Sequence, residues 1–277
     1  MLVTLRDILK IAEAKKCAVG SFNTPNMTSL RAVIDAAEEC NQPVIIMHAQ
    51  IHDEMGICKL EDIAPIMLLY AERAKVPVCV HLDHGTELSY VKKALDYGFT
   101  SVMYDGSELD DVMNVVNTSL AVEFASKTGA SVEGEIGSMG AREGGGAGSQ
   151  SVYTEPGDAL EFVINTHVDA LACAFGTAHG LYTTAPKLDF DRVKRIYDIV
   201  PVPIVMHGGS GVSDEDYKKV ISLGVRKINY YTYMAKAGGN GVANMENPTF
   251  FHDVENAAYE AMKKDVQRAL SLFGGLV

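Results

Sequence analysis

Short runs of apolar and β-branched residues alternate along the chain with longer segments whose apolar positions recur every three or four residues. The short runs predict strands, and the longer segments predict amphipathic helices. Since a helix follows each strand, the sheet should be parallel, and eight such units favour a closed (β/α)8 TIM barrel. Alternation by itself leaves an open sheet as an alternative. The expected strands are 18–22, 43–48, 77–83, 100–105, 131–136, 170–175, 203–207 and 226–230.

Helical segments account for most of the remaining chain. A first helix is expected to open at Thr4, because Leu5, Ile8 and Leu9 then form one apolar stripe. Residues 247–273 are expected to form one long helix or two short ones, as a C-terminal extension that caps the barrel or contacts another subunit. The expected helices between the strands are 28–40, 60–74, 87–97, 109–127, 157–166, 189–199 and 213–223.

Composition narrows the class of protein. The 277 residues, 47% of them hydrophobic and 22% charged, suit one α/β barrel domain spanning residues 1–277. A net charge of -12 argues against a nucleic-acid partner, and the apolar runs are too short to span a membrane. The five cysteines are scattered without a C-x-x-C pair, and the N-terminus resembles a helix rather than an export signal, so we expect a cytoplasmic protein.

Histidines gather where the predicted strands end. In such barrels the active face is formed by the loops that follow the strands, and His84, His179 and His207 each lie there. Three imidazoles from three strands predict a Zn²⁺ site with one open position for a substrate oxygen. His81 shares the strand face of Asp83, so the spacing leaves it as an alternative third ligand.

A second group of residues suits an anion. The loops after the seventh and eighth strands form the usual phosphate site of these barrels, through glycine amides, hydroxyl groups and a helix N-terminus. The candidates there are Gly208, Gly209, Ser210, Asn229 and Thr232. Any anionic ligand of this acidic chain must be held by such a local arrangement.

Carboxylates supply the remaining chemistry. Asp83 precedes His84 at a strand end, so one side chain can bind metal while the other moves protons. Glu133 and Glu135 alternate along one strand and should both point into the barrel. The glycine-rich segment 137–151 is expected to be a mobile loop, either a lid or a disordered insertion, and its Glu143 would act as a base for an α-proton if it closes over a substrate.

Seven sequence blocks, in order between residues 19 and 232, resemble the class II, metal-dependent fructose-bisphosphate and tagatose-bisphosphate aldolases. Seven ordered blocks are far more specific than any single motif. The blocks are GSFN, VHLDHG, SVMYDGS, VEGEIG, ACAFGTAHGLYTTAPKLDF, VMHGGSGVSDE and KINYYT.

The resemblance implies a retro-aldol enzyme with one zinc ion held by His84, His179 and His207. It implies that Asp83 is the acid and base for the hydroxyl group that becomes the aldehyde, and that Glu143 moves the α-proton. It further implies a monovalent cation, Na⁺ or K⁺, a substrate contact at Asn23, and a dimer or tetramer. The residues that would hold the phosphate of dihydroxyacetone phosphate are Gly180, Gly208, Gly209, Ser210, Asn229, Tyr230, Tyr231 and Thr232.

Two positions depart from the pattern of the bisphosphate aldolases. The block after the eighth strand in those relatives resembles Asn-x-Asp-Thr-Asp-x-Arg, in which the first Asp helps to choose sugar stereochemistry and the Arg meets the distal phosphate. Tyr231 and Ala235 occupy those two positions here, and residues 47–50 lack the usual Ser. Without the guanidinium group of the Arg, a bidentate partner for the distal phosphate is missing. We therefore expect an aldehyde other than glyceraldehyde 3-phosphate, or binding of its phosphate by other residues.

Two other functions fit parts of the pattern. A metal-dependent hydrolase on the same barrel would also use histidines and a carboxylate, but it predicts an H-x-H pair on the first strand, where residues 21–23 have none. A phosphosugar-binding protein without catalysis would keep the anion site but would have no use for Asp83 beside three histidines.

Overall fold

The computed structural model describes residues 1–137, 153–182 and 184–275. Within this part, eight parallel strands close into a barrel in the order β4-β3-β2-β9-β8-β7-β6-β5, with β5 pairing back to β4. The (β/α)8 prediction is confirmed, and each strand boundary lies within two residues of the expected one. The eight strands are β2 (Val19–Asn23), β3 (Val44–Ala49), β4 (Val78–Gly85), β5 (Ser101–Tyr104), β6 (Ser131–Ile136), β7 (Ala170–Cys173), β8 (Ile204–Met206) and β9 (Val225–Asn229).

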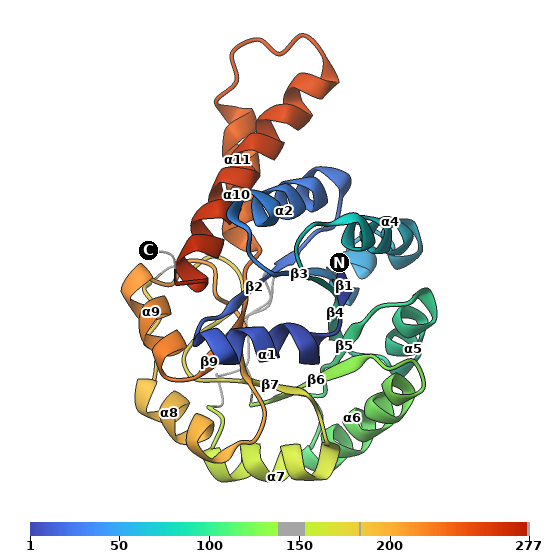
Figure 1. The fold of residues 1–277 in the computed structure, drawn as a ribbon, viewed down its shortest axis with the longest axis vertical. Coiled ribbons are helices and arrows are strands. Elements are labelled where there is room, and N and C mark those ends of the chain that lie inside the picture. Colours follow the sequence, from blue (N-terminus) through green and yellow to red (C-terminus); the bar gives the residue numbers. More distant parts are fainter. Residues whose placement is uncertain (138–152, 183, 276–277) are drawn as a thin grey trace.

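Helices surround the barrel, as Figure 1 shows. Several begin at the side-chain caps that the sequence offers: Asn26 accepts from the amide of Ser29, and Asp110 accepts from the amide of Met113. Their apolar stripes face the strands and form the main core. The predicted helices are α2 (Met27–Cys40), α4 (Leu60–Arg73), α5 (Leu88–Tyr97), α6 (Asp111–Ser126), α7 (Pro156–Thr166), α8 (Phe190–Ile199) and α9 (Asp214–Ser222).

The first helix, α1 (Leu5–Lys15), closes the end of the barrel at which the strands begin. Thr4 caps it as expected, and in Figure 1 it lies across the near end of the barrel. Leu5 and Ile8 of its apolar face join Ile45 and Val205 of the strands in one buried cluster. This end of the barrel is therefore sealed by apolar packing, and the chemistry is confined to the opposite end.

Three elements were not expected. The two-residue strand β1 (Leu2–Val3) pairs with β4, and the short helix α3 (Gln50–Glu54) follows β3. The third is α10 (Thr232–Ala243), whose glycines give it a poor helical signal in the sequence. Those glycines serve packing, because a Cβ on Gly241 would lie 2.6 Å from the carbonyl oxygen of Ala257 in the neighbouring helix.

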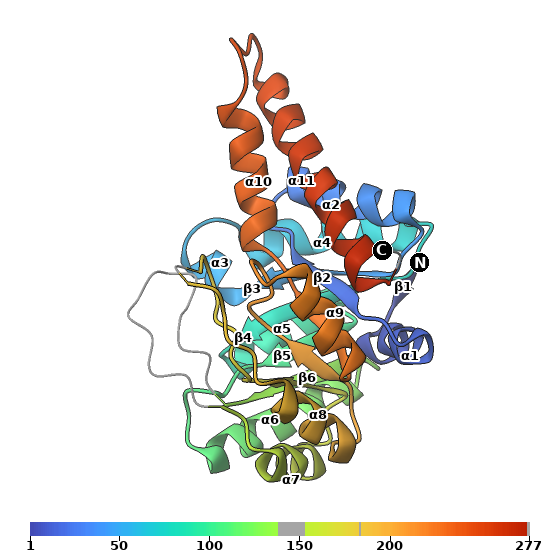
Figure 2. The ribbon, with the colours of Figure 1, turned by 90° about the vertical axis from the view of Figure 1, so that its left-hand side faces the viewer.

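Helices α10 and α11 (Phe251–Phe273) lie side by side and project beyond the barrel, as Figures 1 and 2 show. We call this pair and the connection between them the helical arm. The C-terminal segment is thus one long helix, beginning four residues later than the expected start at residue 247. At the far end of the arm, the side chains of Phe250 and Phe251 are 61% and 75% exposed.

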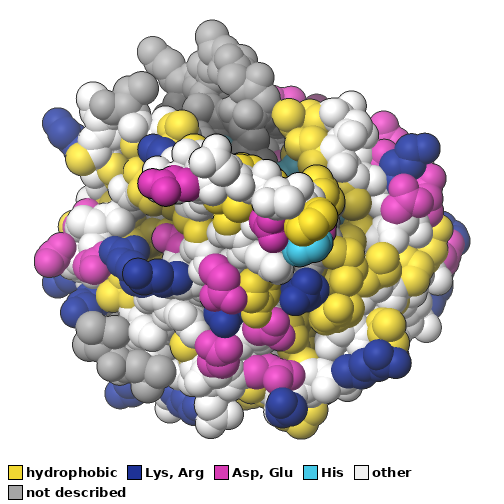
Figure 3. Space-filling model, turned by 90° about the horizontal axis from the view of Figure 1, so that it is seen from above, with side chains coloured by type: hydrophobic (Ala, Val, Ile, Leu, Met, Phe, Trp, Pro, Cys, Tyr) yellow, Lys and Arg dark blue, Asp and Glu magenta, His cyan; other side chains and the backbone are white. Residues whose placement is uncertain are grey.

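No helix in the described residues is long and apolar enough to cross a membrane. Viewed down onto the arm, Lys and Arg side chains are interspersed with Asp and Glu, as Figure 3 shows. A continuous basic surface, which nucleic-acid binding requires, is not seen on this face.

Candidate active site

The end of β4 has an irregularity that brings two consecutive side chains into the barrel. Successive residues of a regular strand point to opposite faces. Between Leu82 and Gly85, however, the register with β5 shifts by one residue, and His84 adopts a left-handed conformation with φ 44°. Such a bulge re-aims side chains, so Asp83 and His84 can both reach the mouth of the barrel.

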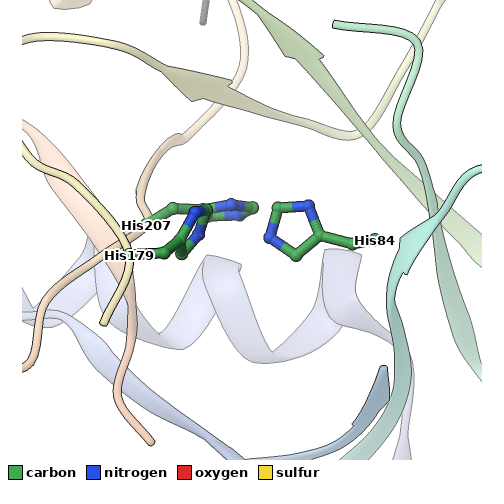
Figure 4. A group of neighbouring side chains, drawn as sticks. All are labelled: His84, His179 and His207. Atoms are coloured by element: carbon green, nitrogen blue, oxygen red, sulfur yellow. The ribbon is translucent and has the colours of Figure 1, made fainter. Parts of the chain in front are cut away.

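Three imidazole rings converge at this mouth, as Figure 4 shows. His84 comes from β4, His179 from the loop after β7, and His207 from the residue after β8. The ring centroids are 4.7 Å apart for His84 and His207, 4.9 Å for His84 and His179, and 5.8 Å for His179 and His207. One nitrogen from each ring lies within 4.8 Å of one from each of the others.

Two of these rings are oriented by carboxylates from neighbouring strands. The Nδ1 atom of His84 lies 2.7 Å from Asp105 Oδ2, and the Nε2 atom of His207 lies 2.8 Å from Glu133 Oε1. An ionised carboxylate only accepts hydrogen bonds, so each of these nitrogens bears the proton. The opposite nitrogen of each ring then faces the centre of the group.

The nitrogens that face the centre are buried and have no hydrogen-bond partner among the described residues. They are Nε2 of His84, Nε2 of His179 and Nδ1 of His207. A buried polar atom without a partner is costly, and a divalent cation would satisfy all three together. The donor set therefore fits a zinc ion with three protein ligands.

Protonation differs within the group. Burial and the charge on His84 lower the pKa of His179 to about 3, and burial lowers the pKa of His207. Burial also disfavours the charged form of His84, but the carboxylates of Asp83 and Asp105 outweigh it and raise the pKa of His84 to about 10. At neutral pH two rings are ready to bind metal, and the third must lose a proton first.

Asp83 is 5% exposed and is held from both sides. The side-chain amide of Asn23 donates to its Oδ2 at 3.1 Å, and that of Asn229 donates to its Oδ1 at 3.0 Å. Burial raises the pKa of Asp83, but the nearby histidine charges outweigh burial and hold the pKa well below the usual value. Asp83 is therefore a carboxylate at neutral pH, beside the three rings and able to accept a proton.

Two further carboxylates lie against the rings. Glu135 Oε2 is 3.3 Å from His207 Nδ1, and His84, Asp105 and Glu135 form a second group of atoms close enough to hold a metal ion. Burial, followed by the charge of Asp105, raises the pKa of Glu135 well above its ordinary value. As expected from their spacing, Glu133 and Glu135 both point into the barrel.

The loop after β8 approaches its neighbours too closely for a side chain. A Cβ on Gly208 would lie 2.3 Å from the carbonyl oxygen of Ala178, and one on Gly209 would lie 2.6 Å from that of Asn229. Tyr182 ties this loop to the one after β7, because its hydroxyl accepts from the amide of Ala178 and donates to the carbonyl of Gly208.

Backbone amides and a helix end surround the same loop. Ser210 Oγ accepts from the amides of Tyr231 and Tyr233, at 3.2 and 3.4 Å. Helix α10 begins at Thr232 without a side-chain cap, so its first turn retains N–H groups that suit an anion. Gly180, with φ 90°, lies next to His179 in the neighbouring loop.

The remaining predicted residues are placed as follows. Glu143 and nearly all of the proposed lid lie outside the described residues. His81 is not a member of the three-ring group, because its Nδ1 lies 2.7 Å from Ser101 Oγ, deeper in the barrel. Tyr230 is buried, and the Tyr231 ring lies 5.1 Å from that of His52.

Sequence reasoning missed two residues at the site. Asp105, in the block SVMYDGS, follows β5 directly, so its position at a strand end was a signal that could have been used. Lys227 was also missed. It alternates with Asn229 on β9 and is fully buried, which an isolated sequence gives no reason to expect of a lysine.

The fold and these residues define a (β/α)8 barrel with a candidate metal site at its mouth, and comparison with known proteins identifies the family. Residues 3–275 match the family described as fructose-bisphosphate aldolase class-II. The chain belongs to this family, whose members are generally metal-dependent, and it is an aldolase, a carbon–carbon lyase.

Relatives cover nearly the whole chain. The Escherichia coli K12 protein YdjI is 39% identical over 99% of this chain and 98% of its own length. Its crystal structure, titled as that of the YdjI aldolase, superposes with a TM-score of 0.89 over 99% of this chain and 98% of that one, at 38% identity.

Two further relatives are named for their substrates. The sulfofructosephosphate aldolase of Alkalicoccus urumqiensis is 36% identical over 97% of this chain and 95% of its own length. The 6-phospho-5-dehydro-2-deoxy-D-gluconate aldolase of Halalkalibacterium halodurans is 38% identical over 87% of this chain and 84% of its own length.

Proposed function

We propose that this aldolase reversibly cleaves a ketose 1-phosphate or ketose bisphosphate to dihydroxyacetone phosphate and an aldehyde, with Zn²⁺ held by His84, His179 and His207. The observation that supports this most directly is the set of three buried, unpartnered ring nitrogens beside an ionised Asp83. A bound Zn²⁺ would act there as a Lewis acid that polarises the substrate ketone. No Schiff-base lysine is then needed.

Asp83 is the acid and base of the reaction. In the cleavage direction its carboxylate accepts the proton of the substrate hydroxyl, the C–C bond breaks, and that hydroxyl carbon becomes the aldehyde. The electron pair of the broken bond stays with the dihydroxyacetone phosphate half. Asn23 and Asn229 orient Asp83 through both carboxylate oxygens, and in our proposal Asn23 also contacts the substrate. Glu143 donates a proton to the carbon of the dihydroxyacetone phosphate half at which the C–C bond broke.

The loops after β7, β8 and β9 bind the phosphate. Backbone amides near Gly180, Gly208 and Gly209 and the first turn of α10 suit a dianion. Ser210, Tyr230, Tyr231 and Thr232 complete this site, and a monovalent cation, Na⁺ or K⁺, accompanies the phosphate. Asn229 also belongs to this group in our proposal, although its side-chain amide is already engaged with Asp83.

The aldehyde half is a group other than glyceraldehyde 3-phosphate. Ala235, in the first turn of α10, offers no charge to a distal phosphate, and the Tyr231 ring packs near His52 at the mouth. Of the two relatives named for their substrates, one is named for a sulfonated sugar phosphate and the other for a phosphorylated, deoxygenated sugar acid. These names support a substrate class wider than fructose 1,6-bisphosphate. Fructose 1,6-bisphosphate turned over as fast as other ketoses, with strong loss when its distal phosphate is removed, would contradict this assignment.

A lyase assay tests the main proposal. A panel of ketose 1-phosphates and ketose bisphosphates is incubated with the enzyme, and release of dihydroxyacetone phosphate is followed by coupled detection. We expect release that a chelator abolishes and Zn²⁺ restores, with the fold unchanged by far-UV circular dichroism. A hydrolase would yield no triose phosphate, and a binding protein would yield no product at all.

We further propose that the enzyme is a cytoplasmic homodimer or homotetramer. All five cysteines are free thiols, which suits a reducing compartment. The helical arm with its exposed Phe250 and Phe251 is the surface most suited to a second subunit. Light scattering coupled to size exclusion should give two or four chains, and a monomer would contradict the proposal.

A further inference from the structure

Among the site residues described above, Lys227 of β9 alone bears a side-chain ammonium group. Its side chain is fully buried inside the barrel, below the mouth. A buried ammonium group is costly unless nearby polar groups compensate it. Two do so here: its Nζ lies 2.9 Å from Glu133 Oε2 and donates to Asn229 Oδ1 at 2.7 Å.

The contact with Glu133 leads to the metal site. While Oε2 of this carboxylate faces Lys227, Oε1 accepts from His207 Nε2 at 2.8 Å. The ion pair therefore holds the carboxylate in the orientation that keeps the proton on Nε2. The Nδ1 atom of His207 is left free to face the other two rings.

The contact with Asn229 leads to the proton-transfer group. A side-chain amide can rotate by half a turn and exchange its oxygen and nitrogen. Because Lys227 only donates, it selects the rotamer in which Oδ1 faces the ammonium group. The Nδ2 atom must then face Asp83 Oδ1, to which it donates at 3.0 Å.

We propose that Lys227 is a positioning residue that orients both halves of the catalytic apparatus from one ammonium group: the imidazole of His207 through Glu133, and the carboxylate of Asp83 through Asn229. This inference rests on the proposed function, in which His207 binds the metal and Asp83 moves the proton. Lys227 itself touches neither substrate nor metal.

Charge balance alone would not require this arrangement. A buried ion pair can often be replaced by apolar residues of similar volume with no loss of stability. The interior at the sealed end of this barrel is built in that way, from residues such as Ile45 and Ala170. The Lys227–Glu133 pair differs from that layer because each partner also holds a group at the mouth.

The test is the double variant Lys227→Met/Glu133→Gln. It removes both charges together, so no uncompensated ion is left in the barrel. The side-chain oxygen of the introduced glutamine still accepts the Nε2 proton of His207, but Asn229 Oδ1 loses its donor. If the methionine variant does not fold, Lys227→Leu/Glu133→Gln gives the same comparison, because leucine likewise offers no donor to Asn229 Oδ1. Lys92→Met, an exposed lysine on α5, is the matched control.

We expect a folded double variant that binds one Zn²⁺ with an affinity within about tenfold of the wild type, measured by competition with a chromophoric chelator. Its kcat should fall by about 10- to 100-fold, the usual effect of removing an outer partner, with KM changed by less than about threefold. A kcat within about threefold of the wild type would overturn the proposal. The kcat is measured with Zn²⁺ in saturating excess, so that any weakening of zinc binding through His207 does not lower it.

A coupling experiment separates the route through Asn229. In an Asn229→Ala background the rotamer that Lys227 selects no longer exists, so the double substitution should lower kcat by less than about threefold further. Equal losses in both backgrounds would show that Lys227 does not act through Asn229. Failure of the proposed function is distinguishable, because the zinc-loaded wild type would then release no triose phosphate.

Discussion

Replacing Asp83 with alanine separates proton transfer from metal binding. Asp83 Oδ1 lies 3.9 Å from His84 Nε2, and Asp83 is not a member of the three-ring group. The substitution removes the base but leaves all three imidazoles and the carboxylates that orient two of them. It also leaves the amides of Asn23 and Asn229 without their acceptor.

The expected loss follows from the role of a general base. Removing such a group costs about 10²- to 10⁴-fold in turnover, which corresponds to about 3–5 kcal/mol in the activation barrier. The effect on zinc affinity should be small. Loss of the negative charge of Asp83 weakens the electrostatic attraction of Zn²⁺ to the site. The same loss lowers the pKa of His84, so a proton competes less strongly with Zn²⁺ for that ring. We therefore expect the apparent zinc affinity at pH 7 to change by less than about tenfold.

Steady-state release of dihydroxyacetone phosphate gives kcat and KM, and metal analysis after gel filtration gives the zinc content. Most of the loss should appear in kcat. Asp198→Ala, an exposed aspartate on α8, is the control for handling and should behave as the wild type. Zinc lost together with activity would refute the division of roles, because Asp83 would then be needed for metal binding. A kcat reduced by less than about tenfold would refute its role as the base.

Three further predictions follow from the geometry. Gly208→Ala should raise KM at least tenfold and lower the melting temperature, because its Cβ would meet the carbonyl oxygen of Ala178 at 2.3 Å; Gly157→Ala, which meets nothing within 4 Å, should do neither. In the arm, Gly241→Ala should destabilise the protein by about 1–3 kcal/mol in denaturant titrations, while Gly239→Ala, in open space, should stabilise it by up to about 1 kcal/mol. Because the pKa of His84 is raised to about 10, zinc binding at pH 7 should release about one proton, and the zinc affinity should fall as pH falls. Calorimetry in buffers of different ionisation enthalpy measures this proton release, and a result of no release would contradict the prediction.

Much of the barrel could be predicted because its signals are local. A buried parallel strand is a short apolar run, and an amphipathic helix repeats its apolar positions within four residues, so each element is legible without its neighbours. The same holds for the ends of strands, which placed His84, His179 and His207 at one face. These assignments needed only the rule that the carboxyl ends of the parallel strands lie at the same end of the barrel.

The missed features depend on contacts between distant segments. Gly238 and Gly241 weaken the helical pattern of α10, and their purpose is seen only where α11 packs against them. Similarly, Lys227 is explained by Glu133, which lies far earlier in the chain on β6, and by the rotamer of Asn229. Which of the two histidines near Asp83 faces the other rings depends on the bulge in β4, and a bulge has no clear sequence signal.

The arrangement of charges explains how one barrel can hold the proposed metal site beside a separate base. Each oriented ring uses one nitrogen for a carboxylate and turns the other to the centre, so neither ring needs to rotate when metal binds, and His84 has only to release its second proton. Asp83 lies outside this three-ring group, and because each of its oxygens accepts from only one asparagine amide, each keeps a further lone pair for a proton. The two asparagines orient Asp83 for proton transfer, and the orientation of Asn229 depends in turn on Lys227, which donates to its Oδ1.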